Sequence, residues 1–196
     1  MSSHHFVKEG QEPALFIFEA FPFDRAASLL EWSPLVIVAD HVVDAVLGWG
    51  IKIDVVLQQQ YPLEKLEEML LDQSPVQIVP CGSTQPLEKG LDFLVEQKYR
   101  AVNILTELGP HFFDHAGKFS GRLQLVAFTE NEKCSLISSG KFEKWMDEGS
   151  KLKIFQDSEP LIHVKGLIKT EAEWVVQHSK LVSIESKSFF WVGEPG

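Results

Sequence analysis

The first 105 residues alternate short apolar runs with amphipathic stretches, and this alternation limits the possible folds more than any other feature of the chain. The apolar runs predict five strands, at residues 13–21, 35–39, 54–57, 76–79 and 101–105. The amphipathic stretches predict four helices between them, at residues 23–32, 42–49, 62–72 and 87–97. Because strands that alternate with helices form a parallel sheet covered on both faces, we expect a Rossmann-like α/β domain here.

The spacing of apolar residues changes after about Phe119, where strand-like segments follow one another without intervening helices. These segments lie at residues 123–128, 133–138, 152–155, 161–164, 173–176, 181–185 and 188–192. Short strands at such close spacing are typical of a sandwich-like all-β domain. Because a stretch rich in small residues, 116–121, separates the two patterns, we expect an α/β domain over residues 1–118 and a β domain over residues 119–196.

Charge and hydropathy argue against several classes of protein. The chain carries 18 Lys and Arg against 28 Asp and Glu, a net charge of −10. Phosphate backbones are bound by clustered positive charge, so this balance argues against nucleic-acid binding. No apolar run approaches the roughly 20 residues of a membrane span, and the first residues lack the features of a secretory signal. We therefore expect a cytoplasmic protein that binds neither nucleic acid nor a membrane.

Ligands of open parallel sheets bind where the strands end, so polar residues that follow the predicted strands are candidate site residues. Among them are Asp40, Gln58, Gln60, Ser83, Thr84, Glu107, His111, Asp114 and His115. A Mg²⁺ ion held against nucleotide phosphates needs hard oxygen ligands, usually several carboxylates. Only Asp40, Glu107 and Asp114 offer carboxylates at these strand ends.

Two segments resemble the thiamine pyrophosphokinase family. In that family one strand ends in Ala-Asp-Gly-Gly, and a Gly-Ile-x-Pro-Asp segment leads into the next strand. Ala39-Asp40 matches the first pattern with His41-Val42 in place of the glycines, and residues 50–54 (Gly-Ile-Lys-Ile-Asp) keep the second apart from its proline. Residues 109–115 (Gly-Pro-His-Phe-Phe-Asp-His) are similar to the family's Gly-Gly-Arg-x-Asp-His turn, with one extra residue and His111 near the arginine's place.

This resemblance implies a fold, an activity and a set of site residues. The expected fold is an α/β domain followed by a β domain, dimerised to form a thiamine pocket. The expected activity converts ATP and thiamine to AMP and thiamine diphosphate, with Mg²⁺ as cofactor. The resemblance makes Asp40 the metal ligand and assigns catalysis to Asp40, Asp114 and His115. The positions expected to bind the cofactor are Gln58, Gln60, Ser83, Thr84, Glu107 and His111.

The sequence departs from the family where the metal would bind. After the third strand the family carries Gly-Asp-x-Asp-Ser, whereas residues 58–61 are Gln-Gln-Gln-Tyr; after the fourth it carries Asp-x-Asp-x-Thr-Asp, whereas residues 81–86 are Cys-Gly-Ser-Thr-Gln-Pro. Neutral amides do not offset the charge of a metal as carboxylates do. We therefore expect a catalytically degenerate relative that serves as a ligand-binding, regulatory or structural homodimer for thiamine or another small molecule. The alternative is a divergent active pyrophosphokinase, or a related phosphotransferase, that uses Asp40, Asp114 and His115.

The retained residues also have structural interpretations. Asp40 would cap the helix that follows it, and residues 83–84 would cap the helix at 87–97. The Asp114-His115 pair would cap a turn or exchange a hydrogen bond. Cys81 is expected to be a buried free thiol rather than a reactive thiolate. The aromatic residues 189–191 alternate poorly, which favours packing in the core or against a partner subunit over stacking on a ligand.

Overall fold

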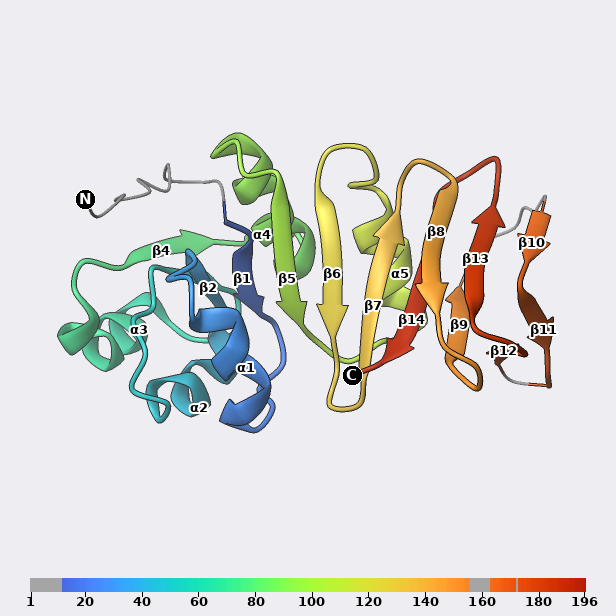
Figure 1. Ribbon diagram of the computed structural model, residues 1–196. Coiled ribbons are helices and arrows are strands. Elements are labelled where there is room, and N and C mark those ends of the chain that lie inside the picture. The colour runs from blue at the N-terminus through green and yellow to red at the C-terminus, as the bar shows by residue number, and fades with distance from the viewer. Residues whose placement is uncertain (1–11, 156–162, 172) are drawn as a thin grey trace, which may run out of the picture. The chain divides into compact units, whose positions relative to one another are not determined.

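The computed structural model of the protein describes residues 12–155, 163–171 and 173–196. They form two compact units, of which the first ends at Thr106 and the second begins at Glu107 (Figure 1). The sequence predicted this boundary after residue 118. The difference arises because residues 110–117 form a helix that packs within the second unit, with the ring of Phe112 centred 5.4 Å from the ring of Trp191.

The first unit contains five parallel strands in the order β5-β1-β2-β3-β4. All five predicted strands are present, as β1 Ala14–Ile17, β2 Val36–Ala39, β3 Val55–Gln58, β4 Gln77–Pro80 and β5 Ala101–Leu105. Every residue of β1 and β2 is buried, as expected for the inner strands of a parallel sheet covered on both faces. The side chains of β4, at the edge of the sheet, are partly exposed.

Four helices connect these strands. They are α1 Phe23–Leu30, α2 Val43–Leu47, α3 Leu63–Met69 and α4 Pro86–Glu96, with short 3-10 turns at Asp40–Val42 and Leu71–Gln73. Gly90 lets α4 approach the sheet closely, because a Cβ at this position would lie 2.6 Å from the ring of Phe16 and 2.9 Å from Leu57. The parallel sheet and its connecting helices confirm the Rossmann-like expectation.

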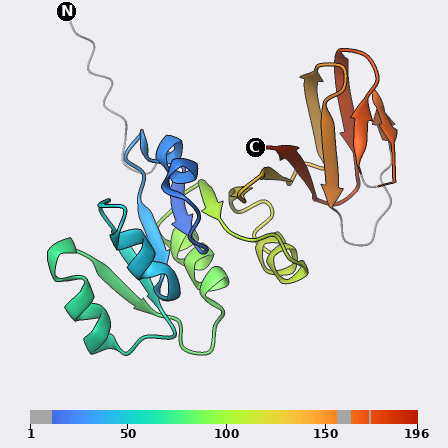
Figure 2. The ribbon, with the colours of Figure 1, turned by 90° about the horizontal axis from the view of Figure 1, so that it is seen from below.

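The second unit begins with helix α5, Pro110–Gly117, and continues as antiparallel strands in two sheets. One sheet has the order β6-β7-β14-β9-β12-β11, and the other has the order β10-β13-β8. The strands are β6 Gln124–Phe128, β7 Glu132–Ile137, β8 Lys141–Met146, β9 Lys151–Phe155, β10 His163–Lys165, β11 Leu167–Lys169, β12 Trp174–Val176, β13 Lys180–Glu185 and β14 Phe190–Pro195. In Figure 2 the helices of the first unit are coloured blue to green, whereas the orange to red segment contains strands only.

Side chains from the two antiparallel sheets meet in one hydrophobic core. The three-stranded sheet contributes Met146 and Ile184, and the larger sheet contributes Leu152, Val176 and Val192. Because two sheets that share a core form a sandwich, the sandwich-like expectation for this part of the chain is confirmed. No helix in either unit, as far as the structure describes them, is long and apolar enough to cross a membrane.

Two of the strands in the second unit were not predicted. In β8 the sequence Lys-Phe-Glu-Lys-Trp-Met places charged residues at three of six positions, which hides the alternation. β11 has only three residues, too few to give a periodic signal. The strand predicted at 161–164 is represented by β10, which begins at His163, and residues 161 and 162 lie outside the described residues.

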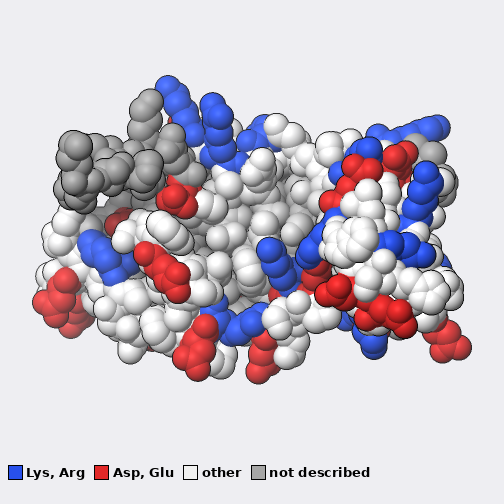
Figure 3. Space-filling model, in the orientation of Figure 1, with Lys and Arg blue, Asp and Glu red and all other residues white. Residues whose placement is uncertain are grey.

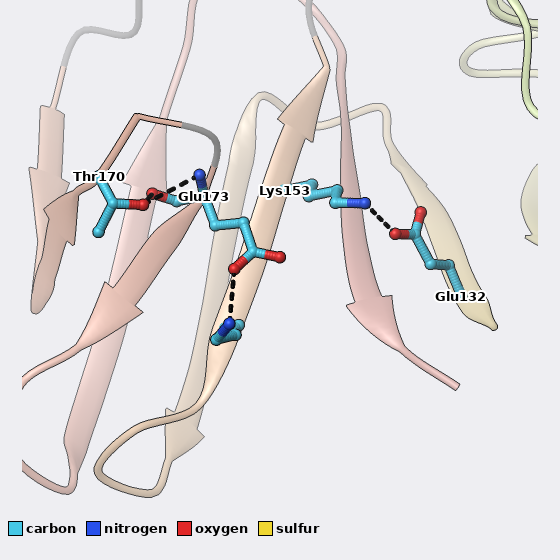
Figure 4. Close-up of polar contacts among 5 residues, drawn as sticks. Glu132, Lys153, Thr170 and Glu173 are labelled. Atoms are coloured by element: carbon cyan, nitrogen blue, oxygen red, sulfur yellow. Dashed lines mark hydrogen bonds and ion pairs between the residues drawn. The ribbon is translucent and has the colours of Figure 1, made fainter.

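Ion pairs link strands of the larger sheet (Figure 4). Lys153 of β9 pairs with Glu132 of β7, and Lys151 pairs with Glu173 at 2.9 Å. The hydroxyl of Thr170 donates to the carbonyl of Glu173 and so closes the turn between β11 and β12. The hydrogen bond from Lys153 to Glu132 raises the pKa of the Lys153 ammonium, so this lysine is charged at neutral pH.

Candidate functional site

Three neighbouring strands of the first unit, β2, β3 and β4, have their carboxyl ends along the same edge of the sheet. Ala39 at the end of β2 pairs with Leu57 in β3, and Gln58 at the end of β3 pairs with Pro80 at the end of β4. Asp40, residues 59–61 and Cys81 therefore follow directly at this edge, where ligands of parallel sheets bind. Within the first unit, the structure brings Asp40 together with the predicted cofactor-binding positions Gln58 and Gln60.

The carboxylate of Asp40 binds the loop that follows β3. The residue is fully buried, and its Oδ2 accepts hydrogen bonds from the backbone N–H groups of Gln59 at 2.8 Å, Gln60 at 2.6 Å and Tyr61 at 2.8 Å. Its Oδ1 is also buried and has no hydrogen-bond partner in the described chain. The side chain makes no capping hydrogen bond to the turn or helix that follows, so the helix-cap interpretation was wrong. The competing donors were the three N–H groups of the loop, which are far away in sequence.

The residues around Asp40 do not fit a Mg²⁺ ion. One Asp40 oxygen already accepts three hydrogen bonds, and the amide of Gln58 donates to the carbonyl of Tyr61 at 3.0 Å. Nowhere in the described residues do three or more His, Cys, Asp or Glu side chains form a group that could hold a metal ion. Mg²⁺ prefers octahedral ligation by several oxygens, whereas the oxygen of Asp40 that has no hydrogen bond, Oδ1, is a single buried ligand atom at this edge.

Cys81, at the end of β4, is a buried free thiol, as the sequence predicted. Burial raises the pKa of this thiol, the negative charge of Asp40 raises it further, and Lys89 partly opposes the shift. The thiol is therefore neutral at pH 7, whereas nucleophilic attack and metal ligation require the thiolate. Cys81 has a structural environment rather than a reactive one.

Ser83 and Thr84 lie in the turn between β4 and α4. Ser83 is exposed and Thr84 is half-buried, and the backbone N–H of Thr84 donates to the carbonyl of Cys81 at 3.1 Å. The cap position of α4 is Gln85, which makes no side-chain capping bond, so the cap interpretation of Ser83 and Thr84 was wrong. Pro86 starts this helix instead, because proline has no N–H to be satisfied in the first turn.

A histidine and a carboxylate that the sequence analysis did not select lie at the ends of β2 and β1. His41 Nε2 is 3.8 Å from the Glu19 carboxylate, and the edge of its ring packs on Phe18 with 5.5 Å between ring centres. The predicted first strand ran to residue 21, which placed Glu19 inside a strand, whereas β1 ends at Ile17. A shorter strand would have revealed Glu19. The pair orients an imidazole, and the neutral thiol of Cys81 follows β4, which is two strands away from β2 in the sheet.

The remaining predicted site residues belong to the second unit. Glu107 is exposed ahead of α5, and α5 itself carries His111 and Asp114, both exposed, and His115, which is half-buried. The family resemblance predicted a turn here; the segment is helical because Pro110 at its first position favours helix initiation. Asp114 and His115 follow His111 by three and four residues, so all three lie on one side of α5. Asp114 also lines a cavity within this unit.

Solved structures that match this chain include several thiamine pyrophosphokinases. The Bacillus subtilis enzyme matches with a TM-score of 0.70 at 11% identity, over 93% of this chain and 98% of its own. The Geobacillus thermodenitrificans enzyme gives 0.71 at 13% identity, over 93% and 97%, and the yeast enzyme gives 0.70 at 11% identity, over 94% and 86%. No protein-family model and no curated protein matches the sequence. At these identities the likeness shows the fold, which is that of a thiamine pyrophosphokinase.

Proposed function

We propose, with the thiamine pyrophosphokinase fold as the premise, that this protein has lost metal-dependent diphosphate transfer and acts as a cytoplasmic, homodimeric binding protein for a small molecule. It would be a pseudoenzyme, for which thiamine is the first ligand to test. Asp40, the cofactor-binding positions and the residues of α5 would then serve structure and ligand binding rather than catalysis.

The observation that carries the proposal is the hydrogen bonding of the buried Asp40 carboxylate. Its Oδ2 accepts three backbone hydrogen bonds from residues 59–61 in a fully buried environment. Hydrogen bonds to a charged group contribute roughly 1.5–3 kcal/mol each, so turning the carboxylate toward a metal would cost several kcal/mol. Diphosphate transfer depends on positioning and on neutralising charge, and an Asp40 held in this way supplies neither.

The neighbouring residues give the same support. Gln58 and Gln60 are neutral, and burial keeps the thiol of Cys81 protonated. No step through ATP or Mg²⁺ can be assigned to these side chains, because a neutral amide and a protonated thiol do not replace the charge of metal-holding carboxylates.

The test of lost catalysis is an assay for thiamine diphosphate. The purified full-length protein is incubated with thiamine, ATP and Mg²⁺, and the products are separated by chromatography, with the Bacillus subtilis enzyme as the positive control. We expect no thiamine diphosphate above the level without protein. Synthesis that Asp40→Asn abolishes would instead establish the alternative, a divergent enzyme that uses Asp40, Asp114 and His115.

The binding and assembly parts are tested separately. A ligand that binds only the folded state raises the unfolding temperature, so thermal unfolding is measured with thiamine, ATP and Mg²⁺ singly and together. We expect a shift with thiamine that does not depend on Mg²⁺. Light scattering after size exclusion should give twice the chain mass of 22.2 kDa, and a monomer would contradict the homodimer.

A further inference from the structure

The second unit contains a cavity of about 600 Å³, large enough for a small organic ligand. Its walls come from α5, from β9, and from the end of the chain at and just before β14. Four of the lining residues are aromatic, namely Phe113, Phe155, Phe189 and Trp191. The cavity therefore presents flat apolar surfaces of the kind that accept an aromatic ring.

These aromatic walls hold one another in place. The ring of Phe113 stacks on that of Phe155, with centres 4.8 Å apart and planes 24° apart, and its centre is 5.6 Å from that of Trp191. Gly117 of α5 admits the ring of Phe189, which would lie 2.9 Å from a Cβ at this position. Because the rings of Phe113, Phe155 and Trp191 pack on one another, a ligand that enters does not have to order them.

Among the described residues, one charged side chain lines the cavity, and it is acidic. Asp114 is exposed, so its carboxylate stands where the cavity meets solvent. No hydrogen bond or ion pair joins this carboxylate to another residue in the described parts of the chain. The lining residues that the structure describes include no Lys or Arg. Aromatic faces and a free carboxylate both attract a cation, and the carboxylate repels phosphates and other anions.

We propose that this cavity binds an aromatic ring that carries an alkylammonium group. The ring enters between the aromatic walls, and the ammonium remains at the opening against the carboxylate of Asp114. This inference rests on the binding part of the function proposed above. It needs no metal and no nucleotide, and it involves only residues of the second unit.

The test compares three probes with the same ring and different charge: tryptamine, 3-methylindole and indole-3-acetate. Each is titrated at pH 7 into the ¹⁵N-labelled full-length protein, and the indole N–H signal of Trp191 is followed. A spectrum of Trp191→Phe identifies this signal among the five tryptophans. We expect tryptamine to bind about fivefold more tightly than 3-methylindole, with indole-3-acetate weakest, because a partly exposed ion pair has about this effect.

Two variants locate the binding. Asp114→Asn should reduce tryptamine affinity to that of 3-methylindole and leave 3-methylindole unchanged, and Phe155→Ala should weaken all three probes. Glu130→Gln is the matched control, since Glu130 is an exposed carboxylate of the same unit that does not line the cavity. The proposal is overturned if no probe shifts the Trp191 signal, if the three probes bind equally, or if Asp114→Asn leaves tryptamine affinity unchanged.

The failure of this proposal can be told apart from failure of the proposed function. The titrations contain no thiamine, ATP or Mg²⁺, so an unresponsive cavity contradicts the ligand assignment and leaves the result of the transfer assay intact. Synthesis of thiamine diphosphate would contradict lost catalysis, whatever the cavity binds.

Discussion

Asp40 of the first unit and Asp114 of the second were both predicted to be site residues, and they lie in opposite environments. Asp40 is fully buried, and one of its oxygens accepts three backbone hydrogen bonds. Asp114 is exposed beside an aromatic cavity, and no hydrogen bond or ion pair joins it to the rest of the described chain. The comparison teaches that a buried carboxylate bound by three backbone donors holds a loop, whereas an exposed, unpaired one remains available to a cation.

The two units also differ in charge. Residues 1–106 carry 7 Lys and Arg against 15 Asp and Glu, whereas residues 107–196 carry 11 against 13. On the face shown in Figure 3, both signs are interspersed over the strands of the second unit. The excess of acid therefore lies in the first unit, whose sheet edge would have to accept the phosphates of ATP. This distribution supports binding without a polyphosphate.

The largest expected change in stability follows from replacing Asp40. Asp40→Ala should lower the free energy of unfolding by about 3 kcal/mol, because three N–H groups lose a charged acceptor. Urea unfolding measures this change. Asp44→Ala is the control, since Asp44 accepts one exposed hydrogen bond from the Tyr61 hydroxyl at 3.2 Å and should change stability by less than about 0.5 kcal/mol. Equal effects of the two variants would remove the distinction between a buried, loop-holding carboxylate and an exposed one.

Substituting one glycine in each unit, Gly90 and Gly117, compares how tightly the two units are packed. Gly90→Ala should destabilise by about 2 kcal/mol, because the new methyl group meets Phe16 and Leu57, which are fully buried and cannot move away. Gly117→Ala meets only the far end of the half-buried Phe189 ring, so its change in stability should be under about 0.5 kcal/mol. Chemical unfolding of both variants measures these changes. A larger loss of unfolding free energy in Gly117→Ala than in Gly90→Ala would contradict this comparison of the two units.

The buried thiol of Cys134 makes the second unit sensitive to high pH. Burial raises its pKa from 9.0 to about 12, so the folded state keeps a proton that the unfolded state releases. The contribution of the protonated thiol to the free energy of unfolding is fully present below pH 9 and is lost as the pH rises toward 12, with about 1.4 kcal/mol lost by pH 10. The free energy of unfolding is measured at pH 8 and at pH 10 for both proteins. The difference between the two pH values should be smaller in Cys134→Ala than in the unmodified protein. An unchanged pH dependence in that variant would contradict the assignment to Cys134.

The smallest expected effect concerns the ion pair between Lys153 and Glu132. Both side chains are partly exposed, at 39% and 25%, so a double-mutant cycle with Lys153→Gln and Glu132→Gln should give a coupling below about 1 kcal/mol. The coupling should fall further at 1 M salt, where exposed charges are screened. A coupling that reached the size of the Asp40 effect would show that surface pairs contribute as much as the buried carboxylate.

Much of the fold could be predicted from local patterns. All five strands of the parallel sheet were predicted, and β5 has the predicted bounds, because apolar runs between amphipathic helices have one favourable arrangement. The charged strand β8 and the three-residue β11 were not predicted, because neither has a periodic apolar pattern. The helix at Pro110–Gly117 was not predicted, because the segment was matched to a turn of the family and the helix-start signal of Pro110 was not considered.

The sites could be predicted only in part. Asp40 and Asp114 were found because they follow strands, and so was the buried thiol of Cys81. The donors to Asp40 come from residues 59–61, some 20 positions away, and no local pattern reports such a contact. The aromatic cavity was missed for the same reason, since Phe113 and Phe155 stack across 42 positions.

The sequence by itself determined the two-part organisation, the parallel sheet, the antiparallel strands and the absence of acidic motifs at two strand ends. These follow from the identity and periodic spacing of neighbouring residues, which local backbone physics converts into helices and strands. Only the tertiary structure decided which carboxylate binds a backbone loop and which stands exposed, and where aromatic side chains leave a cavity. Such properties depend on atoms that meet across the fold, because charge and hydrogen bonding act through space rather than along the chain.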